Sequence, residues 1–272
     1  MAEPTYKELE HSGWREKADA YDDWFARITR PAIEPMLDAI APEYEGKRLL
    51  DICTGTGHLA AAAAQRGAVA EGLDFAEQMV EHARRNYPDL TFTVGDAENL
   101  PYEAGSFDIV ACAFGHLHFD DADRAIAEAC RVLVPGGRYG FTVWCGPGQG
   151  AAMFKLIVDA VKAHGTTQVG LPPAPPLFRF ADPEESRATL ERLGFKDVAS
   201  RVLDLAWEAE SGAEILEMIY KSIVRTPILF ERQTPEARER IHAAIVEGAE
   251  QYREGGKLKL GFPAALVTAT RA

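Results

Sequence analysis

The stretch LLDICTGTGHLAAAAAQRG, residues 49–67, decides the fold. It joins a short apolar run to a loop with two glycines, Gly55 and Gly57, and then to an alanine-rich helix pattern that closes at Gly67. A buried strand, a glycine loop and a helix in this order are typical of an α/β unit that binds a nucleotide. The stretch by itself leaves open which nucleotide the loop holds.

Strand and helix patterns alternate downstream of this stretch, which predicts an α/β fold. We expect a Rossmann-like, doubly wound, mostly parallel seven-stranded sheet with N-terminal helices and a helical cap insertion. Upstream, residues 14–40 show helical spacing, and Pro31 and Pro35 are expected to break it. The expected strands of the core cover residues 48–53, 68–74, 90–94, 106–114 and 137–144, with helices over 58–67, 76–87 and 121–134.

The pattern is less regular after Trp144. We expect a helix over 151–164, a proline-rich connection over 170–183, a helix over 183–195 and a strand over 196–207. Residues 212–254 predict two helices broken near Pro227 and Pro235. The last apolar stretch predicts a closing strand.

Composition excludes several classes of protein. The chain has 272 residues and a formal charge of −13, and no lysine- or arginine-rich patch is present to attract nucleic acid. No run of eighteen apolar residues and no signal-peptide pattern occurs, so we expect a cytoplasmic protein without membrane insertion. The four cysteines lack CxxC spacing, which favours reduced thiols over disulfides and predicts no metal site.

The acidic residues around the loop favour a cationic ligand over a dinucleotide. Gly55, Gly57 and Ala60 match the dinucleotide pattern, so a nicotinamide-dependent reductase is one interpretation. However, Asp51 precedes the loop, and an unpaired carboxylate about 4 Å from a phosphate charge would cost roughly 4 kcal/mol. Asp74, at the end of the next strand, can accept both hydroxyls of a ribose, whether the ligand is a dinucleotide or a cationic nucleoside.

Four ordered stretches resemble one family. LLDICTGTG, GLDFAEQMVEHAR, VGDAENLPYEAGSFDIV and EACRVLVPGGRYGFTVW are similar to the class I, seven-stranded S-adenosylmethionine-dependent methyltransferases, especially the small-molecule type of ubiquinone and menaquinone biosynthesis. The resemblance covers about a third of the chain. It departs from the family at Cys53, where glycine is common.

The resemblance implies S-adenosylmethionine as cofactor and S-adenosylhomocysteine as product. Asp51 would hold the methionine amino group, the loop glycines would approach the methionine portion, and Asp74 would take the ribose hydroxyls. The third strand end would frame the adenine, and Phe114 would lie beside the sulfonium. The full set of expected cofactor-binding residues is Asp51, Thr54, Gly55, Gly57, Asp74, Phe75, Met79, Asp96, Ala97, Glu98 and Phe114.

The sequence indicates the residues that bind the acceptor less clearly than those that bind the cofactor. A general base is needed only if the acceptor arrives protonated, and His116 and His118 are the candidates, with structural histidines as the alternative. Packing of an amphipathic helix on the sheet explains Trp14 and Tyr21 equally well, and ordinary surface placement explains the arginines better than acceptor binding does. The acceptor or lid candidates are Trp14, Tyr21, Trp144, Phe178, Arg179, Tyr220 and Arg225.

We therefore expect methyl transfer to oxygen, nitrogen or an activated carbon of a small molecule, by a monomer or homodimer. A protein that binds the cofactor without methylating, or a nicotinamide-dependent reductase, remains an alternative. In this interpretation residues 1–272 form one domain, with a helical lid over 1–45, a cofactor-binding core over 46–145, an acceptor cap over 146–256 and a closing strand over 257–272.

Overall fold

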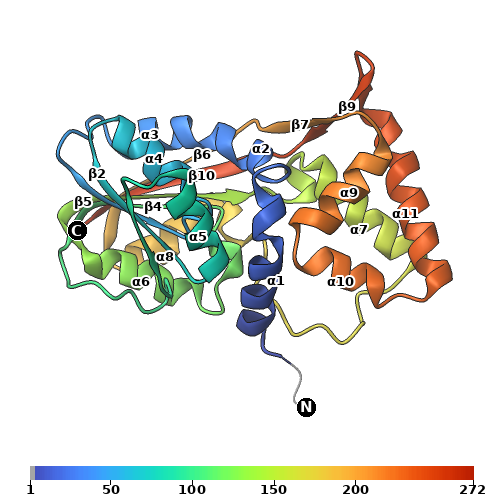
Figure 1. Cartoon of the computed structure of the whole chain (residues 1–272), viewed down its shortest axis with the longest axis horizontal. Coiled ribbons are helices and arrows are strands. Elements are labelled where there is room, and N and C mark those ends of the chain that lie inside the picture. The colour runs from blue at the N-terminus through green and yellow to red at the C-terminus, as the bar shows by residue number, and fades with distance from the viewer. Residues whose placement is uncertain (1–3) are drawn as a thin grey trace. The chain divides into compact units, whose positions relative to one another are not determined.

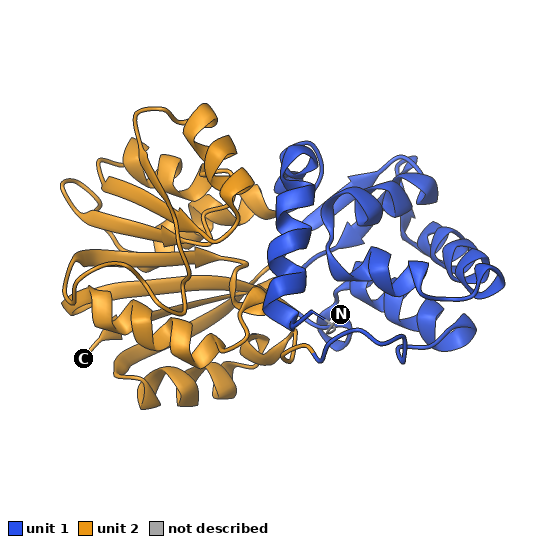
Figure 2. Ribbon diagram, turned by 60° about the horizontal axis from the view of Figure 1, so that its bottom comes forward, with its two compact units in different colours: residues 1–28, 145–173, 204–263 blue, residues 29–144, 174–203, 264–272 orange. Residues whose placement is uncertain are grey.

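The computed structural model describes residues 4–272, which cluster into two compact units (Figure 2). Unit 1 comprises the described residues up to Ile28 together with residues 145–173 and 204–263. Unit 2 comprises residues 29–144, 174–203 and 264–272. Because the chain enters each unit more than once, neither unit is a continuous segment of sequence.

A seven-stranded sheet forms the centre of unit 2 (Figure 1). Its strand order is β3-β2-β1-β4-β5-β10-β6, and only β10 runs antiparallel to its neighbours. The order reverses at β1, which pairs in parallel with both β2 and β4, and ligands of open α/β sheets bind outside the carboxyl ends of strands at such a point. The expected mostly parallel seven-stranded fold is confirmed. The strands are β1 (Arg48–Ile52), β2 (Val69–Asp74), β3 (Thr91–Val94), β4 (Phe107–Ala113), β5 (Leu133–Trp144), β6 (Phe195–Leu203) and β10 (Ala264–Arg271).

Small residues let the helices of unit 2 lie close to this sheet. Ala60 and Ala63 of the alanine run are fully buried in α4, which contacts β1 and β2. A Cβ added at Gly140 of β5 would lie 2.2 Å from Cγ1 of Ile40, so α3 needs glycine beneath it. The helices of unit 2 are α3 (Ile33–Ile40), α4 (His58–Gln65), α5 (Glu77–Asn86), α6 (Ala122–Val132) and α8 (Pro183–Arg192), with short 3-10 turns at Arg30–Ala32, His116–His118 and Arg179–Ala181. In the described part of the chain, none of the helices combines the length and apolarity needed to cross a bilayer.

Unit 1 is a helical body with a small antiparallel sheet, of strand order β7-β9-β8. Apolar residues at helical spacing form its core, and Ile215, Met218, Ile219, Ile241 and Ile245 are all fully buried. Its elements are α1 (Tyr6–Tyr21), α7 (Ala152–His164), α9 (Gly212–Ser222), α10 (Arg225–Glu231), α11 (Pro235–Ala249), β7 (Ala206–Ala209), β8 (Arg253–Glu254) and β9 (Lys257–Gly261), with 3-10 turns at Pro147–Gln149 and Glu250–Tyr252. The short α2 (Ala26–Thr29) includes the residues at which the chain passes from unit 1 to unit 2.

Proline positions explain where the expected helix boundaries were wrong. Residues 212–254 contain three helices rather than two, because Pro227 and Pro235 lie in the first turns of α10 and α11. A proline is tolerated in a first turn, since the backbone N–H that it lacks would have no partner within the helix. For the same reason Pro35 lies inside α3 instead of ending a helix.

The expected strand over 196–207 is divided between two sheets. β6 ends at Leu203 in the large sheet, and β7 begins at Ala206 in the small one. The strand at the end of the chain likewise begins only at Ala264, while residues 257–261 form β9 in the small sheet. Pro263 separates β9 from β10, and a proline cannot donate to a strand ladder.

Candidate functional site

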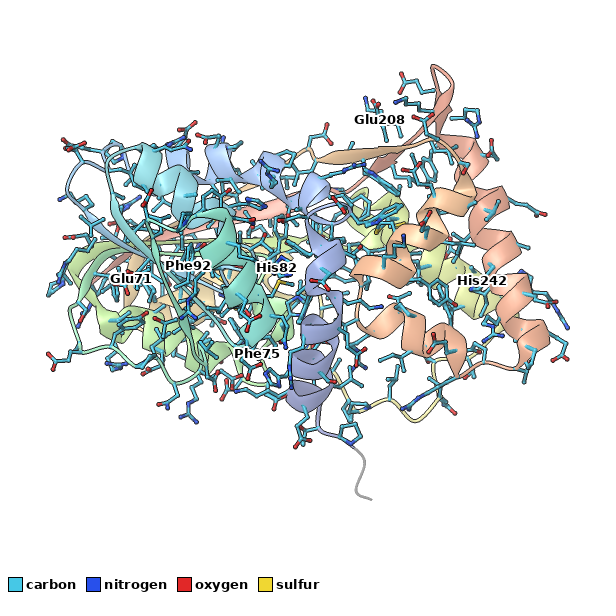
Figure 3. The ribbon with its side chains drawn as sticks, in the orientation of Figure 1. Glu71, Phe75, His82, Phe92, Glu208 and His242 are labelled. Atoms are coloured by element: carbon cyan, nitrogen blue, oxygen red, sulfur yellow. The ribbon has the colours of Figure 1, made fainter. Side chains whose placement is uncertain are left out.

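The glycine loop between β1 and α4 is held from one side by β2. The N–H of Thr54 donates to the carbonyl of Leu73 at 3.0 Å, and the N–H of Gly55 donates to Asp74 Oδ2 at 2.9 Å. Gly57 has a φ of +90°, and a Cβ there would lie 2.8 Å from the ring of Phe92, which is labelled in Figure 3. The loop therefore has one fixed conformation that a larger residue at position 57 would disturb.

Asp51 places a buried carboxylate directly behind this loop. The residue is 1% exposed, and its Oδ2 accepts from Thr54 Oγ1 at 2.6 Å and from the N–H of Ala60 at 3.2 Å. Its Oδ1 is buried and has no hydrogen-bond partner. Burial raises the pKa of Asp51 to about 8, against the opposing hydrogen bond from Thr54. An unpaired buried carboxylate oxygen is unfavourable unless a donor reaches it, and an ammonium group supplies both the donor and the compensating charge.

Asp74 closes the other side of the loop. It is 6% exposed, its Oδ1 accepts from the N–H of Ala76 at 3.0 Å, and its Oδ2 accepts from Gly55. Burial raises the pKa of this carboxyl, although the two backbone hydrogen bonds and His118 oppose the shift. Each oxygen retains one further lone pair, so the carboxylate can still accept two hydroxyls. Asp74 thus both shapes the loop and presents acceptors beside it.

The residues expected around an adenosine differ in exposure. Met79 is 3% exposed and belongs to the packing of α5, whereas Phe75 is half-exposed at the end of β2. Asp96 is half-exposed, and its Oδ1 accepts from the N–H of Glu98. Glu98 is buried, and its Oε1 accepts from the N–H of Asp120 at 3.1 Å. This geometry favours Phe75 and Asp96 as contact residues and gives Glu98 a structural part.

Two aromatic rings cover the ends of β4 and β5. Phe114 and Trp144 stack with ring centroids 3.9 Å apart and an interplanar angle of 22°. Both side chains are at most 5% exposed, and Phe114 has a φ of +59°, a backbone conformation that is strained for an aromatic residue. The stack makes Trp144 a support for Phe114.

The structure distinguishes the two candidate bases. His116 is 3% exposed, its Nε2 lies 2.8 Å from the hydroxyl of Tyr139, and its ring packs against Phe141 and Phe180. These surroundings favour a structural role. His118 is half-exposed, and its electrostatic interaction with Asp74 lowers the pKa of that carboxyl.

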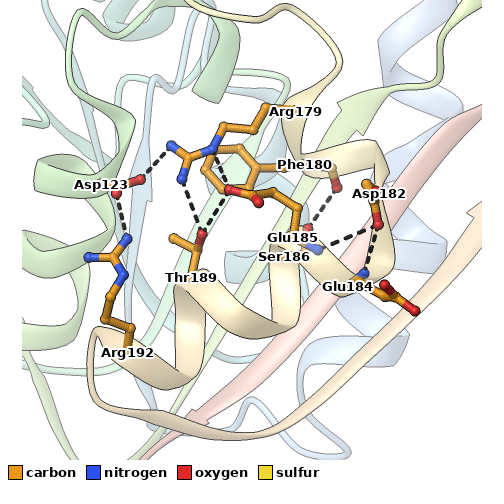
Figure 4. A network of polar contacts seen from close by, with 9 residues as sticks. All are labelled: Asp123, Arg179, Phe180, Asp182, Glu184, Glu185, Ser186, Thr189 and Arg192. Carbon is orange, nitrogen blue, oxygen red and sulfur yellow. Dashed lines mark hydrogen bonds and ion pairs between the residues drawn. The ribbon is translucent and has the colours of Figure 1, made fainter.

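Arg179 is occupied by an ion-pair network (Figure 4). Its guanidinium donates to Asp123 at 2.6 Å, to Glu185 at 2.7 Å and to Thr189 at 3.2 Å, and it lies over the ring of Phe180. The network joins α6 to the turn before α8, and Arg192 contributes a second bond to Asp123. This geometry favours a structural role for Arg179 over acceptor binding. Phe178, just before it, is half-exposed and has no assigned role.

The other acceptor candidates belong to unit 1, and two polar pairs occur among them. The hydroxyl of Tyr220 lies 3.1 Å from Nε2 of His242, a residue that the pattern did not single out. Arg225 donates to the carbonyl of Pro172 at 3.0 Å and lies over the ring of Tyr6, while its Nη1 is buried without a hydrogen-bond partner. Trp14 and Tyr21 meet edge to face at 5.9 Å on α1.

One residue outside the predicted site, Gly72, also shapes the packing behind the loop. Gly72, inside β2, leaves room for Thr54 and Phe92, since an added Cβ would lie within 2.7 Å of both side chains. A glycine within a strand often marks such a close approach. Among residues 4–272, no group of three histidine, cysteine, aspartate or glutamate side chains is placed to hold a metal ion.

Comparisons with known proteins agree with this geometry. Residues 49–137 match a family described as "Methyltransferase domain". The chain is 29% identical over 270 residues to nocamycin O-methyltransferase of Saccharothrix syringae, covering 92% of this chain and 94% of that protein. It is 34% identical over 174 residues to demethylmenaquinone methyltransferase of Deinococcus radiodurans, covering 58% of this chain and 71% of that protein. Among solved structures, phosphoethanolamine N-methyltransferase 2 of Haemonchus contortus, in complex with phosphomonomethylethanolamine and S-adenosylhomocysteine, has the same fold with a TM-score of 0.60 at 18% identity, covering 99% of this chain and 60% of that one.

Proposed function

The chain belongs to the class I S-adenosylmethionine-dependent methyltransferases, and we propose that its acceptor is a small molecule methylated at oxygen, nitrogen or an activated carbon. The observation that carries the site is the unpartnered Oδ1 of Asp51 beside the glycine loop. A pyrophosphate has no donor for this oxygen, whereas the ammonium of a methionine moiety would donate to it and stabilise the ionised carboxylate.

The described residues fit the cofactor in three places. Asp51 would accept from its amino group, the backbone of Gly55 and Gly57 would lie against its methionine portion, and Asp74 would accept from the ribose hydroxyls. Phe75 and Asp96 would contact the adenosine, and Phe114 would lie next to the reacting sulfur. When bound, S-adenosylmethionine supplies a methyl group on a sulfonium, which is already activated for in-line displacement.

The protein's own part is to align the acceptor and to exclude water. If the acceptor arrives protonated, we propose that a ring nitrogen of His118 takes the proton, because this imidazole is half-exposed and interacts electrostatically with Asp74. His116 would keep its position against Tyr139 and serve only as structural support.

The names of two similar proteins support a small acceptor. One is a nocamycin O-methyltransferase, and the other is a demethylmenaquinone methyltransferase. The chain's net charge of −13 also argues against a polyanionic acceptor such as nucleic acid. Neither name assigns the acceptor of this chain, so the proposal stops at the chemical class.

Calorimetry and a product screen test this function. We expect S-adenosylhomocysteine to bind the purified protein and NADH not to bind it. A screen of phenols, quinols and amines with S-adenosylmethionine should then release homocysteine in a coupled assay, and the product should gain the mass of one methyl group. Binding of NADH alone would favour a reductase. Cofactor binding combined with a product of unchanged mass would favour the protein that binds without methylating.

A further inference from the structure

Two cysteines lie together at the base of the glycine loop. Cys53 is the first residue after β1, and Cys112 lies on β4, the strand that pairs directly with β1 through Asp51 and Ala111. A Cβ added at Gly115 would lie 2.6 Å from the sulfur of Cys112 and 2.8 Å from the sulfur of Cys53. The two sulfurs therefore flank the same small space, and each thiol shifts the pKa of the other.

The two thiols differ in access and in acidity. Cys53 is half-exposed, and Cys112 is fully buried. Burial raises the pKa of Cys112, but the neighbouring Cys53 and His116 outweigh burial and lower the pKa to about 5. The neighbouring Cys112 and burial raise the pKa of the Cys53 thiol. Because the thiolate is the reactive form, Cys112 is the sulfur that an oxidant attacks, and Cys53 is placed to resolve the oxidised form.

The backbone at Cys53 connects the cysteine pair to the glycine loop. Its φ of +57° lies in the left-handed region, which glycine occupies more easily than any other residue. Thr54 and Gly55, the two residues that follow, carry the hydrogen bonds to β2 and to Asp74 that hold the loop. A displacement of the Cys53 backbone would therefore also displace these hydrogen-bonded loop residues.

From this geometry we propose that Cys53 and Cys112 form a reversible disulfide on oxidation by hydrogen peroxide, and that this bond weakens binding of the methyl donor. The first part stands on the two thiols alone, and the second rests on the proposed function of the loop. It makes the cysteine pair an oxidative modification site at the floor of the cofactor loop.

The chemistry balances with peroxide as the only oxidant. The Cys112 sulfur attacks one peroxide oxygen, the O–O bond breaks, and a sulfenic acid and one water are formed. The Cys53 sulfur then attacks the Cys112 sulfur and displaces hydroxide, which takes the remaining thiol proton and leaves as a second water. Two thiols are oxidised by two electrons, and one peroxide is reduced to two waters.

Bond formation must move the loop. A disulfide requires a sulfur–sulfur distance of about 2.05 Å, shorter than any non-bonded contact between two sulfurs. Cys112 lies within a paired strand, so Cys53 at the start of the loop is the residue that moves. Gly115 offers no side chain in the way, which leaves the path between the sulfurs open to this closure.

The test compares reduced and peroxide-treated full-length protein. We expect oxidation to remove two hydrogen atoms from the intact mass and to give a proteolytic peptide pair linked through Cys53 and Cys112. Binding of S-adenosylhomocysteine, measured by calorimetry, should weaken by about tenfold or more, since the loss of one hydrogen bond to a charged group has an effect of about this size. Dithiothreitol should restore both the mass and the affinity.

Three variants make the result specific. Cys53→Gly suits the positive φ, and it should bind S-adenosylhomocysteine with the same affinity before and after peroxide, as should Cys112→Ala. Cys130→Ser, which alters a half-exposed thiol on α6, should respond to peroxide as the parent does. Absence of the linked peptide overturns the disulfide, and a linked protein with unchanged affinity overturns its effect on binding. A reduced parent protein that fails to bind S-adenosylhomocysteine refutes the proposed function instead, and the linked peptide still decides the disulfide separately.

Discussion

Binding of the cofactor product should release nearly one proton at pH 7, because Asp51 must ionise to accept an ammonium group. In the ligand-free protein, burial raises the pKa of Asp51 to about 8. At pH 7 only about a tenth of the molecules then carry the charge, so about 0.9 proton leaves for each ligand bound. The proton comes from the carboxyl whose Oδ1 has no partner in the protein.

The same ionisation sets the pH dependence of affinity. The protonated carboxyl cannot form the ion pair, so the apparent affinity for S-adenosylhomocysteine should rise about ninefold from pH 6 to pH 7 and about fivefold from pH 7 to pH 8. The sign follows from the raised pKa, since a higher pH supplies the ionised form that the ligand selects. An ordinary aspartate would already be ionised over this range and would show no dependence.

Calorimetry in buffers of different ionisation enthalpy measures both quantities. Released protons appear as a buffer-dependent contribution to the binding enthalpy, and the affinity follows from the same titrations at pH 6, 7 and 8. Asp51→Asn should lose the proton release and most of the affinity, whereas Asp159→Asn, the same change at an exposed position on α7, should behave as the parent. Proton uptake, or an affinity independent of pH with Asp51 intact, would refute the reasoning.

Three further predictions follow from the same geometry. The ligand-free protein should lose about 2 kcal/mol of unfolding free energy from pH 6 to pH 8 relative to Asp51→Asn, because the unfolded chain ionises this carboxyl freely and the folded one does not. Denaturant titrations at both pH values measure this change, and an equal change in the two proteins would contradict the prediction. Gly57→Ala should weaken binding of S-adenosylhomocysteine and destabilise the protein by more than about 1 kcal/mol, since an added Cβ meets the ring of Phe92 at 2.8 Å. Gly46 also has a positive φ but lies in open space, so Gly46→Ala should retain affinity. Calorimetry and thermal unfolding compare the two variants, and similar effects of both would argue against the steric explanation. His116→Ala should lower the melting temperature because it removes buried contacts. His118→Ala should lower turnover of a protonated acceptor and leave the melting temperature nearly unchanged. The opposite result would mean that His118 is the structural residue and His116 the base.

Local patterns were sufficient to predict the core of the fold. Alternating strand and helix periods between residues 48 and 144 arise from burial on sheet faces and helix stripes, and the observed strands follow them closely. The placement of Asp51 and Asp74 on either side of the glycine loop was predictable for the same reason. Parallel neighbouring strands bring their carboxyl ends to one edge of a sheet.

Partners far apart in sequence could not be predicted in this way. His116 and His118 have the same local pattern, and only the burial of His116 against Tyr139 distinguishes it from the half-exposed His118. Arg179 was an acceptor candidate from the sequence, and its ion pair with Asp123, 56 positions away, favours a structural role instead. A pattern of residue types contains no information on which side chains share a contact.

By itself, the sequence determined the α/β alternation, the strand, loop and helix around Gly55 and Gly57, and the acidic residues at the loop, because these depend on local backbone preferences and periodic burial. Only the tertiary structure decided that Asp51 keeps an unpartnered oxygen, that Phe114 stacks on Trp144, and that the sulfurs of Cys53 and Cys112 flank the same space. Those properties depend on desolvation and on contacts between strands, which exist only after the sheet has assembled.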